Sequence, residues 1–187
     1  MIKYHDNIEL WIEDIREGDK YAFEKLYLKF YSPLCKFAWR FLRSSHISEE
    51  LVQDVFLNIW ESRASLDPDK NITSFLYKDV RNKVLNHLKH QNIVKEYNPE
   101  IEWLNPAAVT QLHDFDGNDV FIKTVKKAIE NIPEYARQIY KLNRKDGLTY
   151  REISEVLDIS PKTVEAQMSK ALKSLRRDLF QYGTKIV

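Results

Sequence analysis

The 187-residue sequence is poor in residues that break helices or cross-link a chain, with four glycines, six prolines and one cysteine. The single cysteine, Cys35, excludes an internal disulfide and any multi-cysteine zinc site. Its aromatic neighbours favour a small buried hydrophobe over a nucleophile. The composition is 43% hydrophobic and 30% charged. Together with the scarcity of glycine and proline, this composition predicts an all-α fold with genuine hydrophobic cores.

Membrane and enzyme signatures are also missing from the sequence. No apolar run reaches the roughly 18 residues of a membrane span, and the first residues, MIKYHDNIELW, lack the basic-then-apolar pattern of a signal peptide. Glycine-rich phosphate loops, HExxH and nucleophile motifs are absent, and the five histidines are scattered. We therefore expect a cytoplasmic protein that is not an enzyme and that has no cofactor or metal.

The net charge of +1 conceals an uneven distribution along the chain. Residues 1–94 carry 14 Lys and Arg against 14 Asp and Glu, residues 95–120 carry one against six, and residues 121–187 carry 14 against 8. The three segments therefore have charges of zero, −5 and +6. This pattern predicts two domains, 1–94 and 121–187, joined by an acidic linker. A basic C-terminal domain is typical of proteins that bind nucleic acid.

The clearest local motif, a helix-turn-helix, lies between residues 148 and 177. Thr149 and Glu152 form a capping box that begins one short helix. Ser160 followed by Pro161 begins a second. Apolar residues at spacings of three and four predict one buried stripe on this second helix, namely Val164, Met168, Leu172, Leu175 and Leu179.

The other face of this second helix is basic and polar. It carries Lys162, Thr163, Gln167, Ser169, Lys170, Lys173, Arg176 and Arg177. A helix in the major groove of DNA needs donors near its N-terminus for base edges and cations further along for phosphates. The alternative interpretation is an ordinary helical hairpin with a solvated basic face.

The first part of the N-terminal domain predicts two helices. A short amphipathic segment over residues 8–17 ends at Gly18, and Asp19 can cap a longer helix. The apolar pattern continues past Pro33, so the proline should kink this helix without ending it. Eight aromatic residues track the helical period and are expected mostly in the core: Tyr21, Phe23, Tyr27, Phe30, Tyr31, Phe37, Trp39 and Phe41.

A third helix is expected to begin after the cap residue Ser48. Leu51, Val55 and Ile59 point to one side of it. The opposite side carries a mixed acidic and apolar stripe, composed of Glu50, Gln53, Asp54, Leu57 and Glu61. Such a stripe can dock a basic partner helix, or it can be plain solvated surface.

A fourth helix is expected to begin after Asn71, behind a turn at residues 67–69. Its inner stripe recurs every four residues, at Leu76, Val80, Val84 and Leu88. Its outer face carries Lys78, Arg81, Asn82, Asn86 and Lys89, preceded by Phe75 and Tyr77. In single-stranded nucleic acid, cations meet the backbone while amides and aromatic faces meet the bases. A basic, exposed helix face without this function is the alternative.

Three segments together resemble the signatures of extracytoplasmic-function (ECF) sigma factors, the smallest members of the major bacterial sigma family. They are ISEELVQDVFLNIW, FLYKDVRNKVLNHLK and IPEYARQIYKLNRKDGLTYREISEVLDISPKTVEAQMSKALKSLRRDL. The resemblance runs in the order of the family from about Asp14 to Leu179, apart from the linker. The style of YLKFYSPLCKFAWRFL and of RNKVLNHLK is similar to sigma factors from the Bacteroidetes.

The resemblance implies two helical domains that bind core RNA polymerase and read a promoter. The third helix matches the one that docks on the clamp helices of the polymerase, with Glu50, Gln53, Asp54, Leu57 and Trp60 as contacts. The loop 62–71 and the helix 75–89 match the part that captures the melted non-template strand at the −10 element. The implied contacts to that strand are Phe75, Tyr77, Lys78, Arg81, Asn82, Asn86 and Lys89.

By the same resemblance, residues 161–177 match the helix that reads the −35 element as duplex DNA. Its implied contacts are Ser160, Lys162, Thr163, Glu165, Gln167, Ser169, Lys170, Lys173 and Arg176. The acidic linker matches a segment that passes from the active-site cleft of the polymerase through the RNA exit channel. The implied partners are promoter DNA, the clamp helices of the largest polymerase subunit, the flap of the second subunit, and an anti-sigma factor, which in this family is often membrane-anchored.

Two residues depart from the usual pattern of the family. Asn86 stands where many members have Asp, so the charge is lost while a hydrogen-bonding amide remains. Glu165 stands where many have Lys or Arg, at the head of the recognition helix. An acid cannot bind phosphate there, but it could accept a hydrogen bond from a cytosine amino group, or face Lys162. The −35 sequence is therefore left open by this pattern.

Two other classes of protein fit parts of the sequence. A repressor or response regulator would read DNA with the helix-turn-helix and use residues 1–94 for dimerisation or ligand sensing. The separate basic, amide-rich fourth helix argues against that reading. An adaptor would instead bind a protein partner through the N-terminal helices. A repressor should footprint duplex DNA alone, whereas a sigma factor should need core polymerase.

Overall fold

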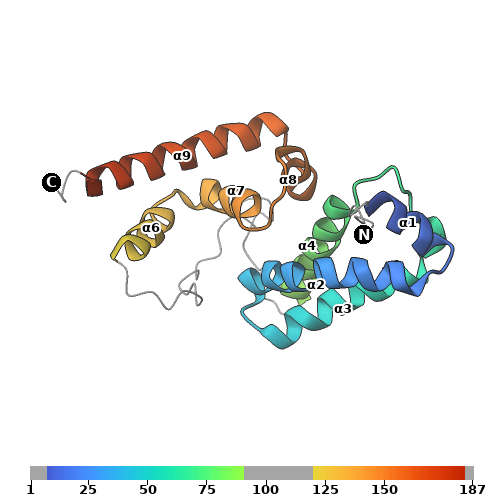
Figure 1. The fold of residues 1–187 in the computed structure, drawn as a ribbon. Coiled ribbons are helices and arrows are strands. Elements are labelled where there is room, and N and C mark those ends of the chain that lie inside the picture. Colours follow the sequence, from blue (N-terminus) through green and yellow to red (C-terminus); the bar gives the residue numbers. More distant parts are fainter. Residues whose placement is uncertain (1–7, 91–119, 184–187) are drawn as a thin grey trace, which may run out of the picture. The chain divides into compact units, whose positions relative to one another are not determined.

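The computed structural model describes residues 8–90 and 120–183 (Figure 1). Within these two ranges the regular structure is helical throughout, which confirms the predicted all-α fold. The chain divides into two compact units, residues 1–97 and residues 98–187. The predicted acidic linker, 95–120, lies outside the described residues except for its last residue. That residue, Val120, begins the first described helix of the second unit.

The first two helices are joined by a tight turn. α1 spans Ile8–Arg16 and α2 spans Lys20–Leu42, and the two helices contact each other. Gly18, between them, has φ +91°, a conformation that favours glycine. The carboxylate of Asp19 accepts hydrogen bonds from two backbone amides of the first turn of α2, at 2.7 and 3.2 Å. Pro33 lies inside α2, so both the predicted cap and the predicted continuation past the proline are confirmed.

The third helix begins one turn earlier than its sequence suggested. α3 spans Ser45–Glu61, and its N-cap is Ser44, whose hydroxyl accepts from the amide of Ile47 at 3.4 Å. The prediction that Ser48 caps this helix is therefore wrong. The hydroxyl of Ser48 lies inside the first turn and donates to the carbonyl of Ser44 at 2.6 Å. The chain turns sharply before this point, because Arg43 adopts the left-handed conformation with φ 55°.

A structured loop connects the third and fourth helices. It begins with the 3₁₀ turn η1, Arg63–Ser65. The carboxylate of Asp67 then accepts from the backbone amide two residues further on, at 3.1 Å, as expected for the predicted turn. The side chain of Asn71 accepts from an amide in the first turn of α4, at 2.9 Å, and α4 spans Ile72–His90. The predicted Asn71 cap is thus confirmed.

α2 is the central helix of the N-terminal unit, because it contacts α1, α3 and α4. Of its eight aromatic residues, Phe30 and Phe37 are buried, Tyr21 is exposed, and the remaining five are half-buried. The rings line the helix contacts: Phe23 and Tyr27 meet Phe56 of α3 at centroid distances of 6.2 and 4.8 Å. The expected aromatic core is therefore a set of helix seams around a largely aliphatic centre.

The C-terminal unit is built around its last helix. It contains α6 (Val120–Glu130), α7 (Glu134–Arg144), α8 (Tyr150–Leu157) and α9 (Pro161–Gly183). α9 contacts each of the other three. The capping box predicted at the start of α8 is present, with reciprocal hydrogen bonds between its Thr and Glu. α8, the turn and the start of α9 therefore form the predicted helix-turn-helix.

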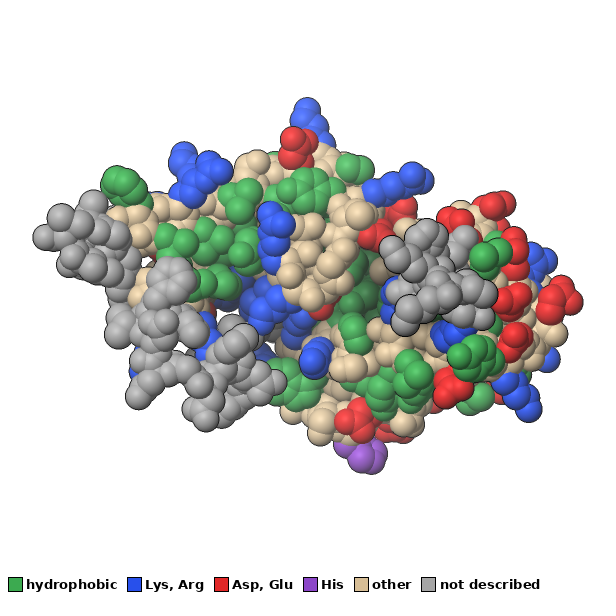
Figure 2. All heavy atoms as spheres, in the orientation of Figure 1, with side chains coloured by type: hydrophobic (Ala, Val, Ile, Leu, Met, Phe, Trp, Pro, Cys, Tyr) green, Lys and Arg blue, Asp and Glu red, His purple; other side chains and the backbone are tan. Residues whose placement is uncertain are grey.

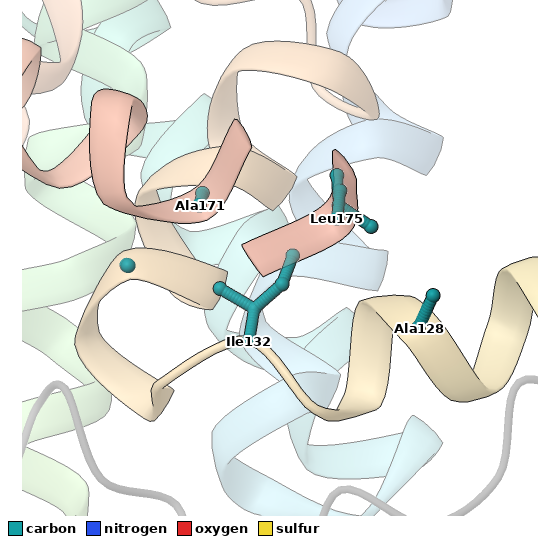
Figure 3. Packing of buried hydrophobic residues seen from close by; sticks show 5 residues of the cluster. Ala128, Ile132, Ala171 and Leu175 are labelled. Atoms are coloured by element: carbon teal, nitrogen blue, oxygen red, sulfur yellow. The ribbon is translucent and has the colours of Figure 1, made fainter. Parts of the chain in front are cut away.

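Small residues allow α9 to approach its neighbours closely. Figure 3 shows Ala171 and Leu175 of α9 facing Ala128 of α6 and Ile132 of the following turn. All four are buried, as are Val164 and Met168 of the predicted stripe, whereas Leu172 and Leu179 are half-buried. The sequence stripe missed Ala171, because alanine carries little hydrophobic weight in a periodicity argument although it sets the distance between packed helices.

Candidate protein and nucleic-acid interfaces

The start of α9 is fixed by a local hydroxyl cluster. The hydroxyl of Ser160 accepts from the amide of Thr163 at 3.1 Å and lies 2.9 Å from the Thr163 hydroxyl. Ser160 therefore caps the helix, as predicted. Both hydroxyls already have partners in this structure, so contacts from them to DNA would extend an existing network.

The basic face of α9 is open to solvent over most of its length. Of the nine predicted contacts to duplex DNA, Thr163 and Gln167 are half-buried and seven are exposed, namely Ser160, Lys162, Glu165, Ser169, Lys170, Lys173 and Arg176. Figure 2 shows Lys and Arg side chains projecting from the surface along α9. This is the arrangement that phosphate contacts require.

Behind this face, α9 is tied to the turn after α6. The amide of Asn131 donates to Asp178 at 2.9 Å, and the guanidinium of Arg177 donates to the other oxygen of the same carboxylate at 2.9 Å. These two hydrogen bonds, that of Asn131 first, hold the pKa of Asp178 below its usual range. Arg177 is itself exposed, but its guanidinium already has this partner within α9.

α4 presents a straight polar stripe. Phe75, Lys78, Asn82, Asn86 and Lys89 follow one another at spacings of three and four, and all five are exposed. The ring of Phe75 is 48% exposed. Residues at these spacings share one face of a helix. The stripe therefore combines an accessible aromatic ring, two amides and two cations, with half-buried Arg81 beside them.

Tyr77 does not belong to this stripe. It is 2% exposed, and its ring packs edge-on against Phe37 of α2 at a centroid distance of 5.1 Å. The prediction that Tyr77 contacts DNA is contradicted by this burial. The inner face of α4 is wide, because the helix packs against both α2 and α3, and it includes Leu76, Val80 and Val84 as predicted.

The polar stripe of α3 is exposed, and three of its members have partners within the domain, the first being Glu50, whose carboxylate lies 3.9 Å from the imidazole of His46. Glu50, Gln53, Asp54 and Leu57 all face solvent. The Gln53 amide donates to the hydroxyl of Tyr31 at 3.4 Å, and burial raises the pKa of that tyrosine to about 12. Asp54 forms an ion pair with Lys83 of α4 at 3.8 Å.

Trp60, the fifth predicted contact on α3, is half-buried. Its ring lies against Phe23 at 5.1 Å and beneath the guanidinium of Arg63 at 4.7 Å. The sequence pattern did not predict that Tyr31, Lys83 and Arg63 contact these α3 residues. Tyr31 and Lys83 lie on other helices, and Arg63 lies beyond the end of the α3 pattern.

The remaining chemistry-bearing groups do not gather into a further site in the described ranges. Burial raises the pKa of the Cys35 thiol, which favours its unreactive neutral form. No three His, Cys, Asp or Glu residues within 8–90 and 120–183 are placed to hold a metal ion. Among the helices of those ranges, none has the length and apolar character needed to cross a membrane.

Comparison with known families assigns both units to one class of protein. Residues 26–93 match sigma-70 region 2, and residues 122–175 match sigma-70 region 4. The first match covers most of α2 and all of α3 and α4, and the second covers the helix-turn-helix. These are the two domains of a promoter-recognition subunit of bacterial RNA polymerase.

Relatives of similar length agree with this assignment. The sigma factor CarQ of Myxococcus xanthus is 24% identical over 166 residues, covering 88% of this chain and 93% of the relative. The ECF sigma factor SigW of Bacillus subtilis is 21% identical over 178 residues, covering 90% and 94%. The chain belongs to the sigma-70 family, within its ECF group, and is a sigma factor that gives RNA polymerase its promoter specificity.

Solved structures show the same fold. CnrH, in complex with the cytosolic domain of CnrY, aligns with a TM-score of 0.60 at 19% identity, covering 94% of this chain and 99% of that one. RpoE in complex with the anti-sigma factor NepR, from Bartonella quintana, aligns with a TM-score of 0.56 at 18% identity, covering 84% and 96%.

Proposed function

We propose that three exposed helix faces divide the work of this sigma factor. The α3 face, defined as Glu50, Gln53, Asp54 and Leu57, docks on the clamp helices of core polymerase. The α4 face, defined as Phe75, Lys78, Asn82, Asn86 and Lys89, captures the melted strand of the −10 element. The α9 face, from Ser160 to Arg176, reads the −35 element as duplex.

The α4 face is the observation that carries this proposal. Its two asparagines lie one turn apart, between a cation on either side, and Phe75 stands exposed at one end. The edge of an unstacked base can pair with an amide, its face can stack on an aromatic ring, and the flanking phosphates can meet the two lysines. A solvated surface would explain the lysines and a single exposed phenylalanine taken separately, so the support for the proposal lies in the ring, the amides and the cations sharing one row.

Capture of one strand also supplies a reason for melting. Extrusion of a base from a duplex costs a few kcal/mol. Stacking on an aromatic side chain contributes about 1–3 kcal/mol per base, and the amides add hydrogen bonds. Binding that is available only to the open strand shifts the duplex toward the open state. Recognition and opening of the −10 element are then one event.

The family assignment extends the proposal to partners and location. We propose a cytoplasmic location, because the protein is expected to act on RNA polymerase. The solved complex of RpoE with the anti-sigma factor NepR supports an anti-sigma factor as a further partner of this protein. We propose a membrane-anchored form of such a regulator, contacts of the C-terminal unit with the flap of the second subunit, and a Bacteroidetes-type polymerase as the natural core enzyme.

The test of the proposed function is footprinting and run-off transcription with purified core polymerase from a Bacteroidetes species. The protein should protect promoter DNA and direct a defined transcript only when core enzyme is present. Permanganate should then modify thymines of the −10 region. Protection of duplex promoter DNA by the protein alone, with no transcript on addition of core enzyme, would instead identify a repressor.

A further inference from the structure

The side chain of Arg63 makes two contacts with Trp60, near the end of α3, where the loop between α3 and α4 begins. The guanidinium of Arg63, the first residue of η1, donates to the carbonyl oxygen of Trp60 at 2.8 Å. The same guanidinium lies over the Trp60 ring, 4.7 Å from its centroid. A hydrogen bond and a cation–π contact thus fix the same planar group from two directions.

Two other elements close around this side chain. The Trp60 ring rests against Phe23 of α2 at 5.1 Å. The turn between α1 and α2 also lies near this side chain, since a Cβ placed on Gly18 would be at ordinary contact distance, 3.9 Å, from Arg63 Nε. α1 also contacts η1 directly. Arg63 is therefore set between the end of α3 and the α1–α2 turn.

The far end of the loop is held independently. Asp67 closes a turn with the amide of Asp69 at 3.1 Å, and Asn71 caps α4 at 2.9 Å. Between these holds, the loop exposes Ala64, Ser65, Asp67, Asp69 and Lys70 to solvent. The hydroxyls of Ser62 and Ser65 also donate to backbone carbonyls at the near end of the loop, at 2.6 and 2.7 Å. Loss of the Arg63 contacts would therefore remove the side-chain tie between this end of the loop and Trp60, while α3 and α4 keep their own cores.

We propose that Arg63 is a positioning residue for −10 recognition, which fixes the direction in which the loop 62–71 leaves α3 and so places its exposed residues beside the captured strand. The proposal rests on the proposed function of α4 and adds the loop to it. It gives Trp60 a role inside the domain, as the plate on which Arg63 lies. It also gives α1 and Gly18 a function, although both precede residue 26, where the match to region 2 begins.

The test uses the full-length protein with core polymerase and a set of promoters that carry single base changes in the −10 or the −35 element. Arg63→Gln should lower the discrimination between preferred and changed −10 bases by about tenfold, the scale of one charge-assisted hydrogen bond. The ranking of −35 bases and the affinity for core polymerase should stay unchanged. Arg63→Lys keeps the charge but lacks the planar guanidinium. Its discrimination between −10 bases should therefore fall between that of the unaltered protein and that of Arg63→Gln.

Arg16→Gln is the matched control, since it removes an exposed cation from neighbouring α1, and it should behave as the unaltered protein. Salt dependence separates positioning from direct contact: a lost phosphate contact would reduce the salt slope by about one, and a reduction of that size in Arg63→Gln overturns the proposal. Unchanged discrimination between −10 bases in folded Arg63→Gln also overturns it. If Arg63→Gln does not fold, unchanged discrimination in Arg63→Lys has the same consequence. The double variant Asn82→Ala with Asn86→Ala is measured in parallel. If it opens promoters normally, the proposed function of α4 fails, and this result is distinct from a failure of the role proposed for Arg63.

Discussion

The α4 and α9 faces are both basic stripes on long helices, but they suit different forms of DNA. α9 has hydroxyls and Gln167 toward its N-terminus and Lys170, Lys173 and Arg176 further along. α4 has two amides within a row of cations and an exposed Phe75. In a closed major groove an aromatic ring can contact only base edges such as the thymine methyl group, whereas on an open strand it can stack on the face of an unpaired base. The difference between the two faces therefore lies in the exposed ring and the amides, and positive charge is common to both.

The largest expected effect comes from removing the α3 face, because both DNA-reading faces act on the polymerase-bound promoter. Asp54→Arg with Gln53→Ala should weaken binding to core polymerase by about a hundredfold, since placing like charges against each other in an interface costs several kcal/mol and about 1.4 kcal/mol corresponds to tenfold. A pull-down with purified core enzyme measures this loss, and circular dichroism measures the fold.

Lys83→Ala is the control for that pair of substitutions. It breaks the ion pair between Lys83 and Asp54 without reversing the charge of the α3 face. The pair lies at the surface, with Lys83 half-buried and Asp54 exposed, and a surface ion pair contributes about 0–1 kcal/mol to stability. Lys83→Ala should therefore bind core polymerase nearly as the unaltered protein does. Equal loss of binding in Lys83→Ala would assign the effect to the helix contact between α3 and α4.

The second prediction separates the two aromatic residues at the start of α4. Tyr77→Ala should lower the free energy of unfolding by about 3–5 kcal/mol, as expected for a buried ring. Phe75→Ala should leave stability nearly unchanged and weaken binding to a pre-melted promoter by about 1–3 kcal/mol per stacked base. Chemical denaturation and competition binding measure the two quantities. Equal destabilisation by both substitutions would mean that Phe75 is a core residue.

The third prediction separates affinity from sequence reading on α9. Lys170→Ala and Arg176→Ala should each weaken binding to all −35 sequences and reduce the salt slope by about one. Substitution of Gln167 or Glu165 by Ala should change the preference at single positions by about 1–3 kcal/mol. Titration of promoter fragments that carry the −35 element, at several salt concentrations, provides the measurement. If all four substitutions act equally on every sequence, the α9 face does not read bases.

The smallest expected effect concerns acid stability of the C-terminal unit. Hydrogen bonds from Asn131 and Arg177 lower the pKa of Asp178 from its ordinary value of 3.8. A lowered folded-state pKa stabilises the fold above the unfolded-state pKa, and this contribution is lost as pH falls through the folded-state value. Thermal unfolding from pH 6 downward should therefore show a slightly smaller acid sensitivity, below about pH 4, in Asn131→Ala than in the unaltered protein. If Asn131→Ala and the unaltered protein have identical acid profiles, the hydrogen bond from Asn131 to Asp178 does not contribute to stability in this pH range.

Much of this architecture could be predicted because the caps are local. Asp19, Asn71 and the Thr149–Glu152 pair each act on amides within three residues. The start of α3 could not be placed in the same way, since Ser44 and Ser48 both precede a turn of plausible helix. The choice between them depends on Arg43, the left-handed residue before Ser44 that ends α2 with a hydrogen bond from its amide to the carbonyl of Trp39.

Residues at the border between the buried and the exposed face of a helix were harder to assign from the sequence. The inner stripe of α4 recurs every four residues, which leaves the width of the buried face undefined. Tyr77 follows Leu76 and falls inside this face because α4 packs against two helices, and Phe75 falls outside it. The contact between Trp60 and Arg63 likewise could not be predicted from the spacing of apolar residues. Sequence periodicity thus locates faces, and packing decides their borders.

The central claim is that α4 captures a single strand whereas α9 reads duplex, and Asn82→Ala with Asn86→Ala tests it most directly. The measurement is permanganate reactivity of −10 thymines in the polymerase–promoter complex, on duplex DNA and on a promoter with a pre-melted bubble. The double variant should keep core binding and −35 binding, lose reactivity on duplex DNA, and recover part of its transcription on the bubble. Opening of duplex promoters at the normal rate by a folded double variant would contradict the account.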